Sequence, residues 1–161
     1  MDTFSHALWG YGLFGYKRYA ALALFFGAMP DLISFGAYLA LQVLHGQWQP
    51  GPPPIADLPS WLFSNYNVGH SFVISFTAIG IIALWKKEIA FAMLAWPFHI
   101  VLDFPFHTFT YFPTPILWPI SDFKVDGISW AHWYIWLPNV AGLICLFYFR
   151  RKHKRRIVAI Q

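Results

Sequence analysis

The sequence predicts an all-α membrane protein, a polytopic transmembrane helical bundle with four spanning helices and a short N-terminal membrane-embedded helix. Three observations lead to this prediction. First, 58% of the 161 residues are hydrophobic and 11% are charged, whereas soluble domains carry about 25% charged residues. Second, four apolar stretches approach or exceed the roughly 20 residues that a spanning helix needs. Third, short basic connections between these stretches alternate with long connections that are poor in basic residues.

The expected helices follow one another along most of the chain. The N-terminal helix covers residues 4–16 and is too short to cross a bilayer comfortably. The four spanning helices cover residues 19–44, 68–85, 89–106 and 130–149. We therefore expect one helical domain over residues 1–149, followed by a basic cytoplasmic tail over residues 150–161.

The basic residues predict how the bundle is oriented. Three short segments are basic, namely residues 17–18, residues 86–87 and the run 150–156, which holds six of the eleven lysines and arginines. The two long loops, residues 46–67 and 108–129, contain a single basic residue. The positive-inside rule then places the basic segments in the cytoplasm and the long loops outside. We expect a multi-pass protein of the plasma or inner membrane, with membrane lipid and not nucleic acid as its partner.

Ionisable side chains inside apolar stretches are costly and point to function. Five occur here: His6, Asp31, His70, His99 and Asp103. Counting about 1.5 Å per residue from the nearest basic residue puts all five in one layer, roughly 8 Å thick, in the outer half of the bilayer. Because the chain has one cysteine, imidazole and carboxylate are the ligands available for a metal, and both bind zinc. The pattern predicts a metal site formed by these five residues.

The spacing of the ligands supports this prediction. His99 and Asp103 are four residues apart, which places both side chains on one face of a helix. Asp31 follows Pro30, and a proline frees backbone groups that are tolerated in mid-membrane only inside protein or beside a cavity. Two buried carboxylates are expensive without a cation. One divalent ion would neutralise them, and a second would attract an anionic substrate.

The same residues are the candidates for catalysis. His107 continues the face of Asp103, and it or His132 is a possible additional ligand or proton carrier. The only glutamate, Glu88, lies at the cytoplasmic end, so an acid–base role would fall to Asp31, Asp103 or His107, or to water activated by the metal. We expect zinc as the cofactor, with one or two ions bound.

These motifs occur in an order that resembles the bacterial and archaeal family of membrane-bound metal-dependent hydrolases, the YdjM-like group. The segments that carry the resemblance are Phe4-Ser5-His6, Pro30-Asp31, Gly69-His70-Ser71 and His99-x-x-x-Asp103. Ser5 stands where that family usually has threonine. The ligand order is also similar to that of zinc-dependent phospholipase C. That similarity implies a primary site of Asp31, His70, His99 and Asp103, with His6 and Asp103 at a second ion.

The sequence leaves three functions open. The first is a membrane-embedded metal-dependent hydrolase, phospholipase-like or phosphatase-like, that acts on a phosphoester-containing lipid at the outer leaflet. The second is a non-catalytic membrane protein whose metal is structural, or which binds lipid or a partner. The third is a divalent-ion transporter, although the predicted spans carry no polar groups below the ligand layer.

Overall fold

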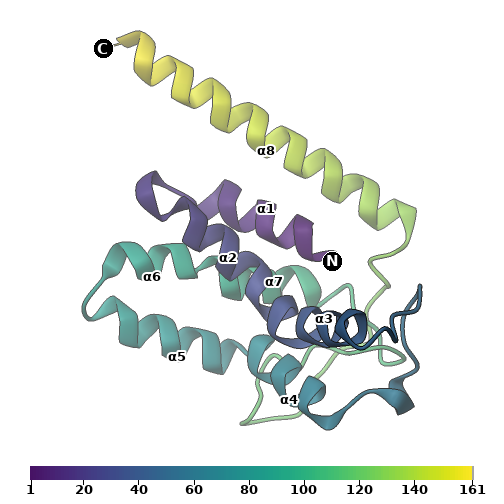
Figure 1. Cartoon of the computed structure of the whole chain (residues 1–161). Coiled ribbons are helices and arrows are strands. Elements are labelled where there is room, and N and C mark those ends of the chain that lie inside the picture. Colours follow the sequence, from purple (N-terminus) through teal and green to yellow (C-terminus); the bar gives the residue numbers. More distant parts are fainter. Residues whose placement is uncertain (161) are drawn as a thin grey trace.

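The chain folds into helices joined by loops (Figure 1). The computed structural model describes residues 1–160, with side chains for all of these except Lys17 and residues 154–160. Within residues 1–160 the only β pairing is an isolated bridge between Thr108 and Tyr111. In chain order the elements are α1 (Thr3–Phe14), the 3-10 turn η1 (Lys17–Tyr19), α2 (Ala20–Asp31), the π-helical segment η2 (Leu32–Gly36), α3 (Ala37–Leu44), the 3-10 turn η3 (Ile55–Asp57), α4 (Ser60–Gly69), α5 (Phe72–Ala83), α6 (Lys87–Met93), α7 (Ala95–Asp103) and α8 (Trp133–Ile160).

Helix α1 packs closely on α2, and α7 contacts both. Glycine permits this approach, because a Cβ atom on Gly10 would lie 2.6 Å from the carbonyl oxygen of Ala23. The core beneath the two helices is apolar: Met29, Trp96 and Ile100 form one buried cluster. The packing of α1, α2 and α7 is what brings their polar residues to one place.

Helix α8 lies along the outer side of α1 (Figure 1). Polar contacts of Asn139 and Arg150 hold it there. The indole nitrogen of Trp9 donates to Asn139 Oδ1 at 2.8 Å, and Asn139 Nδ2 donates to Ser5 Oγ at 2.8 Å. The guanidinium group of Arg150 donates to backbone carbonyls at the end of α1, including that of Tyr11 at 3.0 Å, and so caps the C-terminal end of α1.

The prediction of four spanning helices is wrong. Of the residues that the structure describes, only the continuous helical stretch Ala20–Leu44 is long and apolar enough to cross a membrane. Ser60–Gly69 and Phe72–Ala83 pass the same test as a pair, but they are bent by 56° at the break between them. The stretches predicted at 89–106 and 130–149 do not pass it. The all-helical class is correct, whereas the polytopic bundle is not.

The helices are shorter than the apolar stretches, because breaks interrupt them. The predicted span 68–85 begins inside α4 and continues as α5, whose 12 residues extend about 18 Å. The predicted span 89–106 is divided between α6, with 7 residues, and α7, with 9 residues. At the C-terminal end the helix does not stop where the basic tail was expected. Helix α8 continues to Ile160, and Gln161 lies outside the described residues.

Candidate metal centre

Four side chains from three segments converge on one point: Asp31, His70, His99 and Asp103. One ligand atom from each lies within 4.8 Å of the other three. The two Nε2 atoms of the histidines are 3.2 Å apart. Asp103 Oδ2 lies 3.3 Å from His70 Nε2 and 3.1 Å from His99 Nε2. Asp31 Oδ1 lies 3.8 Å from His70 Nε2 and 3.7 Å from His99 Nε2.

These spacings fit one metal ion. Ligand atoms at 2.0–2.2 Å from a tetrahedral zinc ion lie about 3.3–3.6 Å from one another, close to the measured range. The histidine tautomers fit as well. His70 Nδ1 lies 2.9 Å from the carbonyl oxygen of Tyr66, and His99 Nδ1 lies 2.7 Å from that of Gly27. Since a carbonyl oxygen only accepts, each Nδ1 carries the hydrogen, and the Nε2 lone pairs of the neutral rings face the centre. The cluster could therefore hold a divalent metal ion.

A helix break places His70. Helix α4 ends at Gly69, His70 and Ser71 leave the helix, and the Ser71 hydroxyl caps α5 by accepting from the amide of Ile74. The indole nitrogen of Trp96 donates to the free carbonyl of Gly69 at 2.6 Å. The imidazole of His70 is fully buried and points across to α7 because it does not follow either helix.

Asp103 has a second face toward two further histidines. Its Oδ1 atom lies 2.8 Å from His6 Nε2 and 3.5 Å from His107 Nε2, and the Met1 amino nitrogen contacts the same oxygen. His6 Nδ1, His107 Nε2 and Asp103 Oδ2 are buried without a hydrogen-bond partner among the described residues. Buried polar atoms are normally paired, and a cation bound between the ligands would supply a partner for Asp103 Oδ2.

Burial and neighbouring charges shift the pKa values at the site in different directions. Helices α1 and α7 lie outside the candidate spans. Burial lowers the pKa of His6 to about 4, despite the nearby charge of Asp103. Burial also acts to lower the pKa of His99, but the charges of Asp31 and Asp103 outweigh it and raise that pKa above its ordinary value. For Asp103, burial acts to raise the pKa, and the charges of His6, the Met1 amine and His99 overcome this and hold it well below its usual range.

Five of the sequence-predicted ligands, His6, Asp31, His70, His99 and Asp103, lie at this centre, and the possible additional ligand His107 lies beside it. His132 does not. It is exposed, and its ring stacks on Tyr134 with a centroid separation of 5.0 Å. The ligands were expected to meet because they share one depth in the membrane. They meet instead through the packing of helices and through the break at His70.

The side chains that orient the ligands were not predicted from the sequence. Thr3 Oγ1 donates to Asp31 Oδ2 at 2.8 Å. Tyr66 is 2% exposed, stacks on the ring of His70 at 3.8 Å, and lies 3.1 Å from His107 Nδ1 through its hydroxyl group. His107 Nδ1 also donates to the carbonyl of Phe112 at 2.8 Å. A threonine or tyrosine in an apolar sequence gives no signal of such a role.

A cavity of about 480 Å³ opens directly on the centre. Asp31 and His107 are members of the centre and also line this cavity. Aromatic side chains make up much of the remaining wall, namely Phe4, Phe35, Phe106, Tyr111, Phe112 and Trp130. Among the residues whose side chains the structure describes, no lysine or arginine lines the cavity, and its carboxylates are Asp2 and Asp31. A ligand in this cavity would reach the metal ligands from a largely apolar space.

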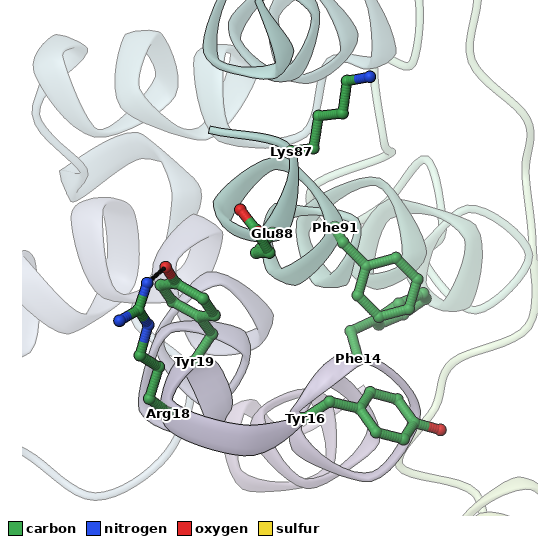
Figure 2. Close-up of a pocket in the computed structure, with 7 residues that line it drawn as sticks. All are labelled: Phe14, Tyr16, Arg18, Tyr19, Lys87, Glu88 and Phe91. Atoms are coloured by element: carbon green, nitrogen blue, oxygen red, sulfur yellow. Dashed lines mark hydrogen bonds between the residues drawn. The ribbon is translucent and has the colours of Figure 1, made fainter. Parts of the chain in front are cut away.

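A different cavity, of about 640 Å³, lies between the turn that follows α1 and the start of α6. Figure 2 shows its lining side chains, with Arg18 beside Tyr19 and with Phe14 facing Phe91. Arg18 donates to the hydroxyl group of Tyr19 at 2.6 Å, and Glu88 adds a negative charge to the wall. None of the metal ligands lines this cavity, so it is separate from the centre.

Comparison with known proteins adds no assignment. No family model matches the chain, and no curated protein or solved structure matches it. The resemblance to membrane-bound metal-dependent hydrolases therefore stays a prediction from the motifs.

Proposed function

We propose that this protein is a membrane-associated, zinc-dependent hydrolase that cleaves a phosphoester-containing lipid at the outer leaflet of the cell membrane. The observation that carries the proposal is the contact between the metal ligands and the aromatic cavity. Asp31 and His107 belong to both. A substrate in the cavity would thus present its phosphoester group at the ligand cluster.

The chemistry is divided between the metal and the chain. A bound divalent ion lowers the pKa of water and stabilises negative charge on phosphoryl oxygens. The chain supplies a base at His107. Its Nδ1 hydrogen is held by the Phe112 carbonyl, which leaves Nε2 free to take a proton from the attacking water and to return it to the leaving alkoxide. Asp103 lies 3.5 Å from that nitrogen and stabilises the ring while it is protonated.

A lipid substrate is supported by the surface of the protein. Large apolar side chains are exposed on many elements, among them Phe4 (83%), Leu44 (78%) and Ile120 (78%). Soluble monomers rarely expose apolar patches of large area, and such patches indicate membrane or partner contact. The outer-leaflet assignment rests on the one candidate span, Ala20–Leu44. The basic residues 17–18 precede this span, and the loop that follows it, which is poor in basic residues, contributes Pro52 and Pro53 to the cavity lining.

Two ions fit the proposal better than one. Asp103 Oδ2 lies near Nε2 of His70 and of His99, whereas its Oδ1 lies near Nε2 of His6. A carboxylate with ligand groups on both oxygens can bridge two metal ions. Paired ions stabilise the attacking and the leaving oxygens in phosphoryl chemistry, which would compensate for the absence of basic residues in the cavity lining.

A structural metal site is the second candidate. Its support is burial, since His70, His99 and Asp103 are each no more than 1% exposed, and closed four-ligand sites are usually structural. The Asp31 side chain, 15% exposed beside the cavity, favours catalysis. The coordination of the bound metal separates the two, because a catalytic site keeps a position for water.

The experiment is a turnover assay with purified protein, zinc and a panel of phosphoester-containing lipids. We expect release of phosphate or of the phosphorylated headgroup by the wild type and loss of at least 100-fold in Asp103→Asn. The control is Asp122→Asn, which makes the same change at an exposed loop residue. Turnover that is equal in all three proteins, or that is absent in the zinc-loaded wild type with every lipid, would exclude the proposal.

A further inference from the structure

A polar cavity of about 470 Å³ lies next to the aromatic cavity at the metal centre. Phe35, Pro52 and Pro53 line both cavities, so the two share a wall. The polar cavity is formed by α3 and by the loop that follows it. Because the two spaces adjoin, a substrate with its phosphoester group at the metal centre could extend a further part into the polar cavity.

The chemistry of the polar cavity differs from that of the metal centre. Three of the chain's four glutamines, Gln42, Gln47 and Gln49, line it together with Trp48 and Asp57. No hydrogen bond joins these three amide groups to another residue that the structure describes. Amides both donate and accept, a carboxylate accepts from hydroxyl groups, and an indole ring packs on apolar C–H faces. No lysine or arginine whose side chain the structure describes lines this cavity.

The loop that carries these groups is stiff. Gly46 and Gly51 have positive φ angles of 67° and 98°, and these two turns bracket the segment with Gln47 and Gln49. Prolines follow at positions 52–54, and Tyr111 donates to the carbonyl of Pro53 at 3.3 Å. A binding loop that is ordered before its ligand arrives loses less entropy on binding.

We propose that the polar cavity binds an uncharged, polyhydroxylated headgroup, such as an inositol, glycerol or hexose unit, of the lipid whose phosphoester the metal centre cleaves. This inference rests on the proposed function for the identity of the lipid. The competing ligand is a choline headgroup, since an aromatic ring beside a carboxylate also attracts a quaternary ammonium ion. A choline headgroup, whose single hydroxyl is esterified to the phosphate, offers no hydroxyl group to the three glutamines, so hydroxyl-rich headgroups fit the lining better.

The first test compares zinc-loaded proteins on two phospholipids that share their acyl chains, one with an inositol and one with a choline headgroup. We expect the wild type to prefer the inositol lipid. Trp48→Leu and Gln47→Leu should each raise the KM for that lipid about tenfold, with little change in kcat. The matched control is Trp85→Leu, at an exposed tryptophan outside the lining. A preference for choline, or variants equal to the wild type, would overturn the inference.

The second test does not depend on turnover. Binding of free myo-inositol to metal-depleted protein is measured by saturation-transfer NMR, with choline as the comparison ligand. We expect transfer to inositol that is lost in Trp48→Leu and kept in Trp85→Leu. If inositol binds in this way and no lipid is cleaved, the headgroup site stands and the hydrolase proposal falls. If lipid is cleaved and inositol does not bind, the headgroup site falls and the hydrolase proposal stands.

Discussion

Metal removal should lower the melting temperature of this protein by a predictable amount. The four ligand atoms already have the separations of a zinc site, so binding requires little rearrangement. An ion present at 1,000 times its Kd stabilises the folded state by about 4.1 kcal/mol. For a chain of 161 residues, each 1 kcal/mol corresponds to roughly 2–4 °C. We therefore expect zinc to raise the melting temperature of chelator-treated protein by roughly 8–16 °C.

A ligand variant makes this prediction specific. His99→Gln removes one ligand nitrogen and the bond from Nδ1 to the Gly27 carbonyl. If the affinity falls about 100-fold, the same zinc concentration is ten times the Kd, and the stabilisation falls to about 1.4 kcal/mol, or roughly 3–6 °C. The control is His132→Gln, an exposed histidine away from the centre, which should keep the full shift.

The assay is thermal unfolding followed by circular dichroism in one detergent, with chelator and with zinc, manganese or magnesium. Zinc should give the largest shift, because imidazole ligands suit it better than the other two ions. The reasoning would be refuted if none of the ions raised the melting temperature of the wild type. It would also be refuted if zinc raised the melting temperatures of His99→Gln and His132→Gln equally, because the ion would then bind elsewhere.

Three further predictions concern the same centre. The variant His6→Asn should lose one of two bound ions in mass spectrometry of the intact protein, and retention of both would contradict the bridging role of Asp103. Zinc affinity measured by calorimetry should fall as the pH is lowered from 8 to 6, because protons compete for His99, whose pKa is raised; an affinity independent of pH would argue against histidine ligands. Tyr66→Phe loses a buried hydroxyl group that donates to the Phe112 carbonyl at 2.9 Å. It should lower the free energy of unfolding by about 1 kcal/mol while zinc content is unchanged, and a loss of zinc would show that the hydroxyl group matters for the ligands.

The ligand residues could be predicted from the sequence because their chemistry conflicts with their surroundings. A histidine or aspartate within an apolar stretch needs a partner, and few candidates exist in a chain with 11% charged residues. The pair His99 and Asp103 could be placed on one helix face from spacing alone. The role of Asp31 followed from its position after Pro30 and from its negative charge.

The path of the chain could not be predicted in the same way. Hydropathy reports that a stretch is apolar, but it does not report where the helix breaks. The break at His70 depends on tertiary bonds, such as those from Trp96 to the Gly69 carbonyl and from the amide of Phe72 to the Ile116 carbonyl. These bonds separate α5 from α4, most of which lies in the predicted loop 46–67, and the two helices are bent by 56°.

The orienting groups had no sequence signal either. The carbonyls of Gly27 and Tyr66 accept from the ligand histidines, and every residue has such a carbonyl.

His132 shows the opposite error. It has the right residue type at the expected outer boundary, yet its neighbours leave it exposed against Tyr134. Residue type selects candidates for a site, and only the packing decides which of them meet.

The most direct test of the central claim is the metal content of the purified protein, measured by inductively coupled plasma mass spectrometry. We predict at least one zinc ion per chain in the wild type and in Asp122→Asn, and less than one tenth of that in Asp103→Asn, with circular dichroism confirming that each protein is helical. A wild type that stays metal-free after incubation with zinc, or an Asp103→Asn variant that holds as much zinc as the wild type, would contradict the account.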